Sequence, residues 1–210
     1  MYCAGNPVKL VDPDGRKIRG FSVVGNQVVI GRRADKDVVR LFTAMSKFSK
    51  GRSAFLEMVK MDTKINLKLT SEENKSAMGE TFGSRRLTKS GHYKRALICI
   101  YEGSITADDS RFYNLEEGLI AIGVHESVHL SPEQIQIDSS RDEDAEDANI
   151  SLYYYNETAP MNAEYDARVQ YSELQKEQGI EWSDDWKNSY ESSKDRNGNE
   201  KPIWNGTEGN

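Results

Sequence analysis

The sequence predicts an α+β fold in which a small mixed or antiparallel sheet packs on helices. Residues with strand-like alternation or β-branched runs occur at 20–33, 64–70 and 94–102, and apolar residues at helical spacing occur between and after them. The chain has 210 residues, of which 37% are hydrophobic and 30% are charged, so it carries enough apolar material for one core. We therefore expect one domain over residues 17–178.

The N-terminal half contains the predicted strands and two predicted helices. Residues 20–33 read GFSVVGNQVVIGRR, in which Gly25-Asn26 separates two β-branched runs and predicts a hairpin. Residues 37–49 have apolar side chains at helical spacing, and Ser53 can cap a second, short helix. Alternation predicts a half-exposed strand at 64–70, and an apolar run predicts a buried strand at 94–102. The polar, glycine-containing segment 71–93 between them predicts a loop or flap.

The most informative segment is 115–130, which reads LEEGLIAIGVHESVHL. Asn114 can cap a helix here, and Glu117 completes a pair that resembles a capping box. The apolar residues cover nearly all sides of that helix, which predicts that it is buried in the core: Leu115, Leu119, Ile120, Ile122, Val124 and Val128.

Two histidines and a glutamate interrupt the apolar surface of this helix. His125 and His129 are four residues apart, so both imidazoles lie on one face and can bind a single zinc ion. Glu126 then lies beside the metal, where a carboxylate can act as the general base of a metallopeptidase. The alternative is that His125 and His129 are core histidines with hydrogen-bond partners, but burying three such side chains is costly unless something binds them.

Such a zinc site needs a third protein ligand. The chain has only one other histidine, His92, which lies upstream of the helix, so we expect a carboxylate. Two downstream regions offer one: the acidic run at 138–147, which we otherwise expect to be a solvated loop, and a helix that begins near 158–160.

Helical geometry separates the two acidic candidates in the second helix. Glu164 shares a face with Ala167 and Tyr171, whereas Asp166 shares a face with polar residues such as Gln170. The first face is the one that would pack inward. Glu164 is therefore the expected third ligand, and Asp166 is the alternative.

The residues His125-Glu126-Ser127-Val128-His129, followed by Glu164-Tyr165-Asp166-Ala167, resemble the HExxH and later ExxA motifs of the glutamate zincins. The resemblance implies a zincin-like domain that hydrolyses peptide bonds. It also implies a zinc ion held by His125, His129 and Glu164, with Glu126 as general base. The sheet would then pack on the HExxH helix and on the helix that carries the third ligand.

The N-terminal segment 1–16 carries a second resemblance. Turn signals at Asn6-Pro7 and Pro13-Asp14-Gly15 flank a short apolar patch. The segment resembles the YxxNNPVxxxDPxG-like end of the core of Rhs/YD-repeat proteins. This resemblance implies that residues 1–16 are the end of such a core and that the following domain is an antibacterial toxin of a bacterial polymorphic-toxin protein. A cognate immunity protein is then an expected partner, and delivery to a target cell the expected route.

Composition argues against several other classes of protein. The net charge of −6 argues against a nucleic-acid partner, and the two cysteines do not make a disulfide framework. No apolar run is long enough to span a membrane, and the N-terminus lacks the pattern of a signal peptide, so we expect a soluble chain. Residues 179–210 predict a polar tail that is partly docked through its tryptophans.

Three alternative functions stay open on the sequence. The domain could bind zinc yet process only its own polyprotein or nothing, as a decayed tail. It could be a metal-free interaction domain with core histidines. It could also hydrolyse a non-protein amide such as a cell-wall crosslink, because the motif defines the chemistry of attack and not the substrate.

Overall fold

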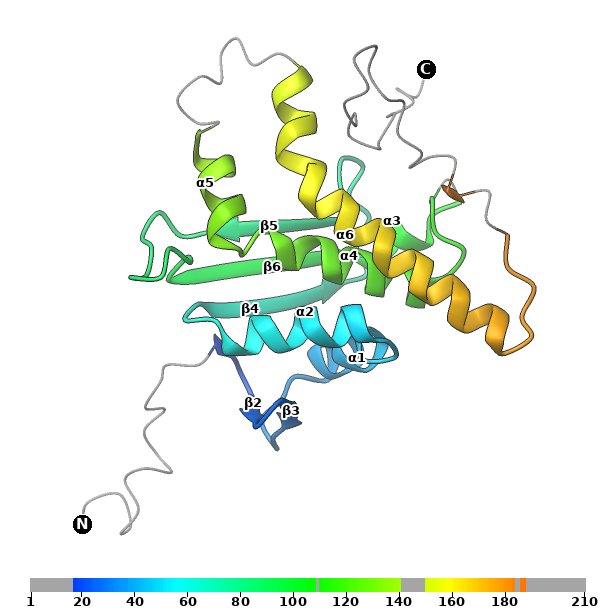
Figure 1. Cartoon of the computed structure of the whole chain (residues 1–210), viewed down its shortest axis with the longest axis horizontal. Helices are drawn as coiled ribbons and strands as arrows, with labels where there is room; N and C mark the ends of the chain where they lie inside the picture. Colours follow the sequence, from blue (N-terminus) through cyan, green and yellow to red (C-terminus); the bar gives the residue numbers. More distant parts are fainter. Residues whose placement is uncertain (1–16, 109, 141–149, 184–185, 188–210) are drawn as a thin grey trace.

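The computed structural model describes residues 17–108, 110–140, 150–183 and 186–187 (Figure 1). The predicted core end at 1–16 and most of the predicted tail at 179–210 lie outside the described residues. The described residues form an α+β fold, as predicted, with a four-stranded sheet, a separate hairpin and helices.

The main sheet has the strand order β1-β4-β6-β5 and is mixed. Its parallel strands are β1 (Lys17–Ile18), β4 (Lys64–Thr70) and β6 (Arg95–Tyr101). Strands β4 and β6 confirm the predicted strands at 64–70 and 94–102. The residues of β4 are alternately exposed and buried, so one face of the sheet packs on the core.

The fourth strand, β5 (Gly79–Gly83), corrects the prediction of a loop or flap over 71–93. Its sequence, GETFG, has glycine at both ends, which gives little local preference for a strand. Antiparallel pairing with β6, from Gly79 opposite Ile100 to Gly83 opposite Ala96, defines the strand instead. The absence of a side chain matters at Gly79, because a Cβ there would lie 2.6 Å from the Glu126 carboxylate. The strand can therefore lie close to the predicted base.

The N-terminal hairpin and the first helices agree with the sequence except at two boundaries: the first helix ends at Met45 and not at 49, and the second begins earlier than predicted. Strands β2 (Phe21–Val24) and β3 (Gln27–Ile30) pair across the predicted turn. Helix α1 (Lys36–Met45) begins after Asp35, whose side chain accepts a hydrogen bond from a first-turn N–H. Helix α2 (Ser49–Lys60) begins before the predicted cap, because the side chain of Gln170, far along the chain, accepts a hydrogen bond from its second residue (3.1 Å).

Helix α4 (Leu115–Val128) is the predicted motif helix and lies at the centre of the molecule. The Asn114 side chain accepts a hydrogen bond from the Glu117 N–H (2.8 Å), as predicted, whereas the Glu117 carboxylate accepts one from the Tyr113 N–H (2.8 Å). All residues from 117 to 127 are buried. The helix packs between the sheet, α1, α2 and α6, which accounts for its apolar residues on every side.

The remaining helices are α3 (Glu102–Thr106), α5 (Pro132–Ser140) and α6 (Ile150–Glu177). Helix α6 crosses α4 on the side away from the sheet (Figure 1). It begins upstream of the predicted start near 158–160 and contains Pro160 in its interior. Within the described ranges, no helix is long and apolar enough to cross a bilayer.

The close approach of α3 to α4 depends on Gly118, where an added Cβ would lie 2.2 Å from Ile105 Cγ2. At Gly123, on the same helix, the nearest atom to an added Cβ would be the flexible Met45 sulfur at 2.9 Å. We expect Gly118→Ala to lower the free energy of unfolding by about 1–3 kcal/mol through overpacking. Urea titration measures this change.

The matched control is Gly123→Ala, which gains the same helix propensity but can displace a flexible side chain. We expect it to be clearly less destabilised than Gly118→Ala. Equal stability of the two variants would contradict the proposed contact between α3 and α4.

Candidate metal centre

The two histidines of the motif lie at the C-terminal end of α4, on the face that meets α6. Their rings are neighbours, with centroids 5.4 Å apart, and both side chains are largely buried. The burial follows from the position of α4 between the sheet and α6. The predicted pairing of His125 and His129 on one helix face is therefore present in the structure.

The Nε2 atoms of both rings point at one carboxylate, that of Glu157 on α6. Glu157 Oε2 lies 3.2 Å from His125 Nε2 and 3.6 Å from His129 Nε2. One ligand atom from each of the three residues lies within 4.8 Å of the others. In tetrahedral metal sites with bonds of about 2.0–2.1 Å, ligand atoms are about 3.3–3.4 Å apart, so the two distances from Glu157 Oε2 are compatible with a shared metal ion.

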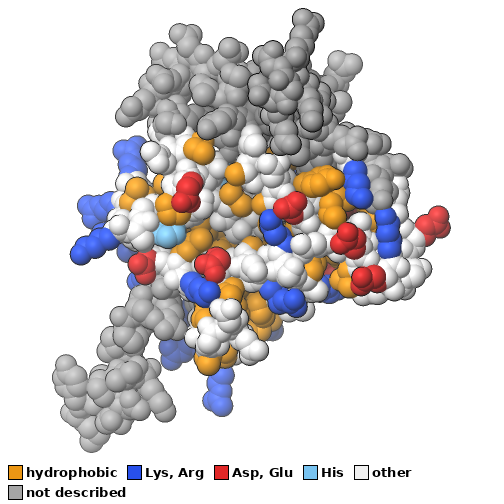
Figure 2. Space-filling view, viewed as in Figure 1, with side chains coloured by type: hydrophobic (Ala, Val, Ile, Leu, Met, Phe, Trp, Pro, Cys, Tyr) orange, Lys and Arg blue, Asp and Glu red, His pale blue; other side chains and the backbone are white. Residues whose placement is uncertain are grey.

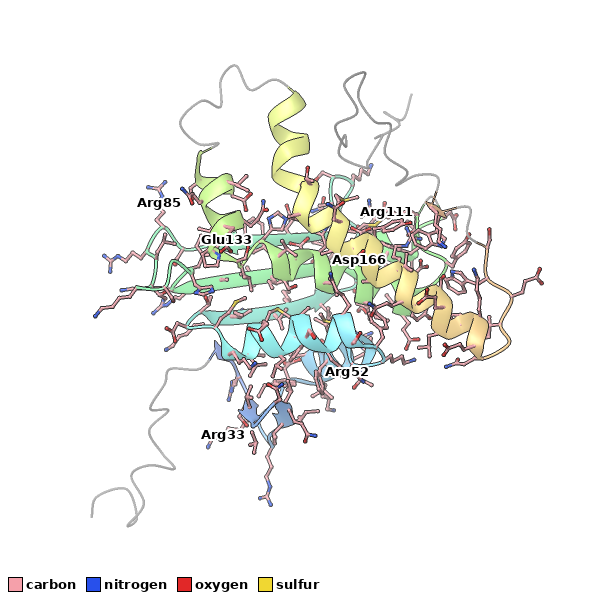
Figure 3. All side chains as sticks on the ribbon, in the orientation of Figure 1. Arg33, Arg52, Arg85, Arg111, Glu133 and Asp166 are labelled. Atoms are coloured by element: carbon pink, nitrogen blue, oxygen red, sulfur yellow. The ribbon has the colours of Figure 1, made fainter. Side chains whose placement is uncertain are left out.

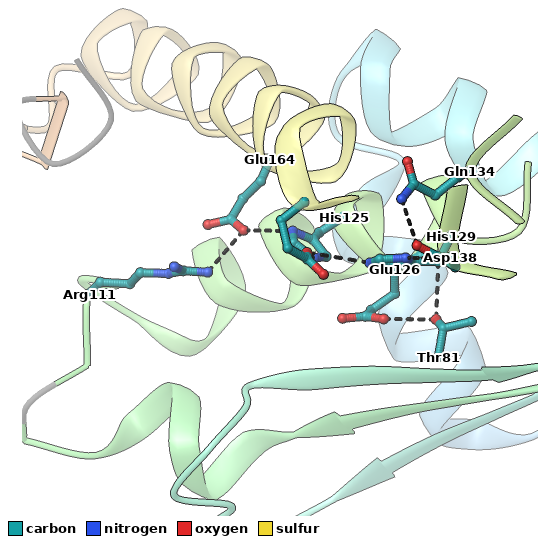
Figure 4. A network of polar contacts seen from close by, with 9 residues as sticks. Thr81, Arg111, His125, Glu126, His129, Gln134, Asp138 and Glu164 are labelled. Carbon is teal, nitrogen blue, oxygen red and sulfur yellow. Dashed lines mark hydrogen bonds and ion pairs between the residues drawn. The ribbon is translucent and has the colours of Figure 1, made fainter. Parts of the chain in front are cut away.

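The Nδ1 atoms of both rings contact a second pair of carboxylates (Figure 4). His125 Nδ1 lies 3.1 Å from Glu164 Oε2, and His129 Nδ1 lies 3.1 Å from Asp138 Oδ2. A carboxylate on Nδ1 holds the proton on that nitrogen and leaves the Nε2 lone pair for a metal. The outer carboxylates therefore favour the tautomer that a shared metal ion needs.

The outer carboxylates are themselves held by hydrogen bonds. Arg111 Nη2 donates to Glu164 Oε2 at 2.9 Å, and Gln134 Nε2 donates to Asp138 Oδ1 at 2.9 Å (Figure 4). Glu164 is completely buried, so a charged partner is needed to offset the loss of its hydration. These contacts fix the orientation of both imidazoles.

The structure places the two predicted candidates for the third ligand in different positions. Glu164 is buried and faces α4, and Asp166 is exposed on α6 (Figure 3), as the helical periodicity predicts. Asp166 pairs with Lys50 at 2.9 Å. Glu164 contacts the Nδ1 side of His125, however, whereas the three residues whose ligand atoms converge are His125, His129 and Glu157.

Glu157 is not among the ligands predicted from the sequence, because Pro160 is typical of the first turn of a helix. Helix α6 continues upstream through Pro160, so Glu157 lies within it. Glu157 and Glu164 are seven residues apart, which is two helical turns, and they share a face. That spacing is the feature of the sequence that could have identified Glu157 as a candidate ligand. Asp138, expected in a solvated loop, lies instead near the end of α5, close to His129.

The predicted base, Glu126, is buried against β5. Its Oε2 accepts a hydrogen bond from Thr81 Oγ1 at 2.8 Å, and only 3% of the residue is exposed. Burial raises the pKa of the Glu126 carboxyl, although the neighbouring histidines His125 and His129 partly offset this shift. A carboxyl with a raised pKa is suited to accepting a proton and then returning it.

A second buried ion pair supports the same interface between α4 and α6. Arg168 Nε donates to Glu117 Oε1 at 2.8 Å, and Arg168 Nη2 donates to the Arg111 carbonyl at 2.8 Å. The guanidinium also lies 4.8 Å from the centroid of the Phe112 ring. Arg168 thus holds the backbone from which Arg111 reaches Glu164.

No protein-family model, curated protein or solved structure matches this chain.

The carboxylates around the histidines make the stability of the metal-free protein depend on pH. Burial lowers the pKa of both imidazoles, but hydrogen bonds to carboxylates outweigh it and raise the pKa of His125 to about 9 and that of His129 to about 10. Since both exceed the unfolded value of about 6.5, their stabilising contribution is complete below about pH 6.5 and is lost as the pH rises through 9 and 10.

We therefore expect the melting temperature of chelator-treated protein to fall between pH 6.5 and 9.5. One pKa unit corresponds to about 1.4 kcal/mol, so a fall of at least about 2–4 °C is expected for a chain of this length. Calorimetry at several pH values measures it. The control, His125→Gln combined with His129→Gln, should show a flatter profile, and identical profiles would contradict this assignment.

Proposed function

We propose that this protein is a zinc-dependent peptide-bond hydrolase of zincin-like architecture, with His125, His129 and Glu157 as metal ligands. The observation that carries the proposal is the arrangement around the two imidazoles. Both Nε2 atoms face Glu157, and each Nδ1 contacts a separate carboxylate. A histidine that needs only a core hydrogen bond does not require a carboxylate on each nitrogen, whereas a metal site uses both.

In this proposal Glu164, which the zincin resemblance implies as the third ligand, orients His125 instead. Arg111 donates to the same Glu164 oxygen that contacts His125 Nδ1, which commits that oxygen to two partners. Asp138 performs the corresponding function for His129. Asp166 is a surface residue that binds Lys50.

A bound zinc ion would lower the pKa of water and polarise the scissile carbonyl. Glu126 accepts the proton from the attacking water and donates it to the nitrogen of the leaving amine. The Thr81 hydroxyl holds Oε2 of Glu126, and the missing side chain at Gly79 leaves space for Oε1. Burial disfavours the charged carboxylate, so the proton that it receives is held until it is transferred to the amine nitrogen.

The biological role that we propose rests on the N-terminal resemblance alone. Residues 2–15 resemble the end of an Rhs-type core, so the hydrolase would be an antibacterial effector delivered behind such a core. An immunity protein from the same cell would then be its inhibitor.

Zinc content distinguishes ligands from orienting residues. We expect wild type to bind about one zinc ion per chain, and His125→Ala and Glu157→Gln to lose it, because each removes one of three ligands. Glu164→Gln should retain zinc with affinity weakened about 10–100-fold, since it loses only the partner of Nδ1. Metal analysis and competition with a chromogenic chelator measure both effects.

Asp166→Asn is the matched control, because it makes the same type of change on the exposed face of α6. It should bind zinc as wild type does. If Glu164→Gln abolishes binding and Glu157→Gln does not, Glu164 is the third ligand. If wild type binds no zinc, the metal-free interaction domain replaces the hydrolase.

The function of Glu126 is tested by Glu126→Gln, which keeps the shape of the side chain and cannot take a proton. We expect it to retain zinc while its rate of hydrolysis falls about 10²–10⁴-fold, as for loss of a general base. Cleavage of a fluorescein-labelled unfolded polypeptide measures the rate. Undiminished hydrolysis in this variant would contradict the proposed mechanism.

A further inference from the structure

The face of the main sheet that points away from the helices is a separate surface. Lys64, Asn66 and Lys68 of β4 are exposed on it, whereas the residues between them are buried against the helices. In Figure 1, α2, α4 and α6 lie together on the opposite side of the sheet. No described helix covers these exposed β4 side chains.

The strand register arranges this face in two rows. Lys64 is paired with Arg95, which gives a cationic row. Asn66 is paired with Leu97, and Leu97 with Phe82 of β5, which gives a second and more apolar row. The rows are two residues apart along each strand, or about 7 Å.

An open concavity of about 550 Å³ lies over these two rows. Its lining contains three cations and no carboxylate: Arg19, Lys64, Ile65, Asn66, Phe82, Gly83, Ser84, Arg95, Ala96 and Leu97. We refer to Arg19, Lys64, Asn66, Phe82, Arg95 and Leu97 as the basic sheet face. None of its three cations forms an ion pair with a carboxylate in the described part of the chain, and Phe82 is 51% exposed.

The connection between β5 and β6 extends the positive charge at this end of the molecule. It contributes Arg85, Arg86, Lys89 and Lys94 and no acidic residue. Arg85 projects away from the end of the sheet (Figure 3), and Lys and Arg side chains gather along this edge (Figure 2). The concentration is notable because the whole chain has a net charge of −6.

We propose that the basic sheet face binds an extended acidic polypeptide segment in which a carboxylate and an apolar side chain are two residues apart. In an extended chain that runs along the strands, side chains two residues apart are about 7 Å apart, which matches the separation of the rows. The carboxylate would contact Lys64 and Arg95, and the apolar side chain would contact Leu97 and Phe82.

A polypeptide fits this surface better than a nucleic acid does. A nucleic-acid duplex carries one charge per about 1.7 Å of its length, so it would extend beyond the cations onto the rest of a chain with net charge −6. A short acidic segment interacts only with the local positive potential. The exposed Phe82 and Leu97 also offer apolar contacts to its other side chains.

The proposed surface is independent of the metal centre. Thr81 of β5 faces α4 and binds Glu126, whereas its neighbour Phe82 faces the opposite side of the sheet. Changes at Glu126 or Glu157 should therefore leave binding on the basic sheet face unchanged. This independence separates failure of the present proposal from failure of the proposed hydrolase.

The test uses the full chain and a fluorescein-labelled peptide of repeated Glu-Ser-Leu-Ser units, measured by fluorescence anisotropy. We expect saturable binding that weakens with salt. A peptide with Gln in place of Glu should bind at least about tenfold more weakly, and Lys64→Glu combined with Arg95→Glu should weaken binding of the acidic peptide to a similar extent. Phe82→Ala should weaken it less, and thermal melting checks that each variant folds.

The matched control is Lys36→Glu combined with Lys75→Glu, which reverses two exposed charges outside the basic sheet face. This variant should bind the acidic peptide as wild type does. Equal binding of the Glu and Gln peptides, or equal loss in both double variants, would overturn the proposal. So would loss of binding in Glu126→Gln or Glu157→Gln, or tighter binding of a 12-nucleotide single-stranded DNA than of the peptide.

Discussion

The structure depends on the cost of burying ionisable side chains within an apolar helix. Helix α4 is enclosed on all sides, yet it carries His125, Glu126 and His129 at one end. Each needs a polar partner to offset its lost hydration, and these partners come from elements other than α4. These partners lie on three elements: Thr81 on β5, Asp138 on α5, and Glu157 and Glu164 on α6. The positions of these elements around α4 are thus tied to one set of electrostatic contacts.

The metal centre and the basic sheet face differ in their local charge. Carboxylates gather around the histidines on the helix side, whereas Arg19, Lys64 and Arg95 line the other face. The net charge of −6 does not reveal this local difference, because it sums over the whole chain. Strand β5 belongs to both surfaces, with Thr81 directed to α4 and Phe82 to the opposite face.

The sequence predicted the parts of the fold that local patterns determine. The strands at 64–70 and 94–102, the hairpin, and the motif helix with its Asn114 cap all follow from periodicity and capping. Strand β5 was not predicted, because its pairing with β6 defines it and its own sequence has little preference for a strand. Glu157 was not predicted as a metal ligand, because proline is typical of a first helical turn, whereas α6 continues upstream through Pro160. The contacts of Glu164 and Asp138 with the Nδ1 atoms of the histidines depend on how the helices pack against one another. The periodicity of the sequence does not predict this packing.

The arrangement of α4 and α6 also determines when the site can form during synthesis. His125 and Glu164 are 39 residues apart in the chain, and Glu157 lies on the same late helix. A nascent chain emerges from the ribosome N-terminus first, so α4 is available before α6. Until α6 docks, both imidazoles lack Glu157, and His125 also lacks Glu164. The set of His125, His129 and Glu157 is therefore assembled only once α6 has folded against α4, after most of the described chain has been synthesised.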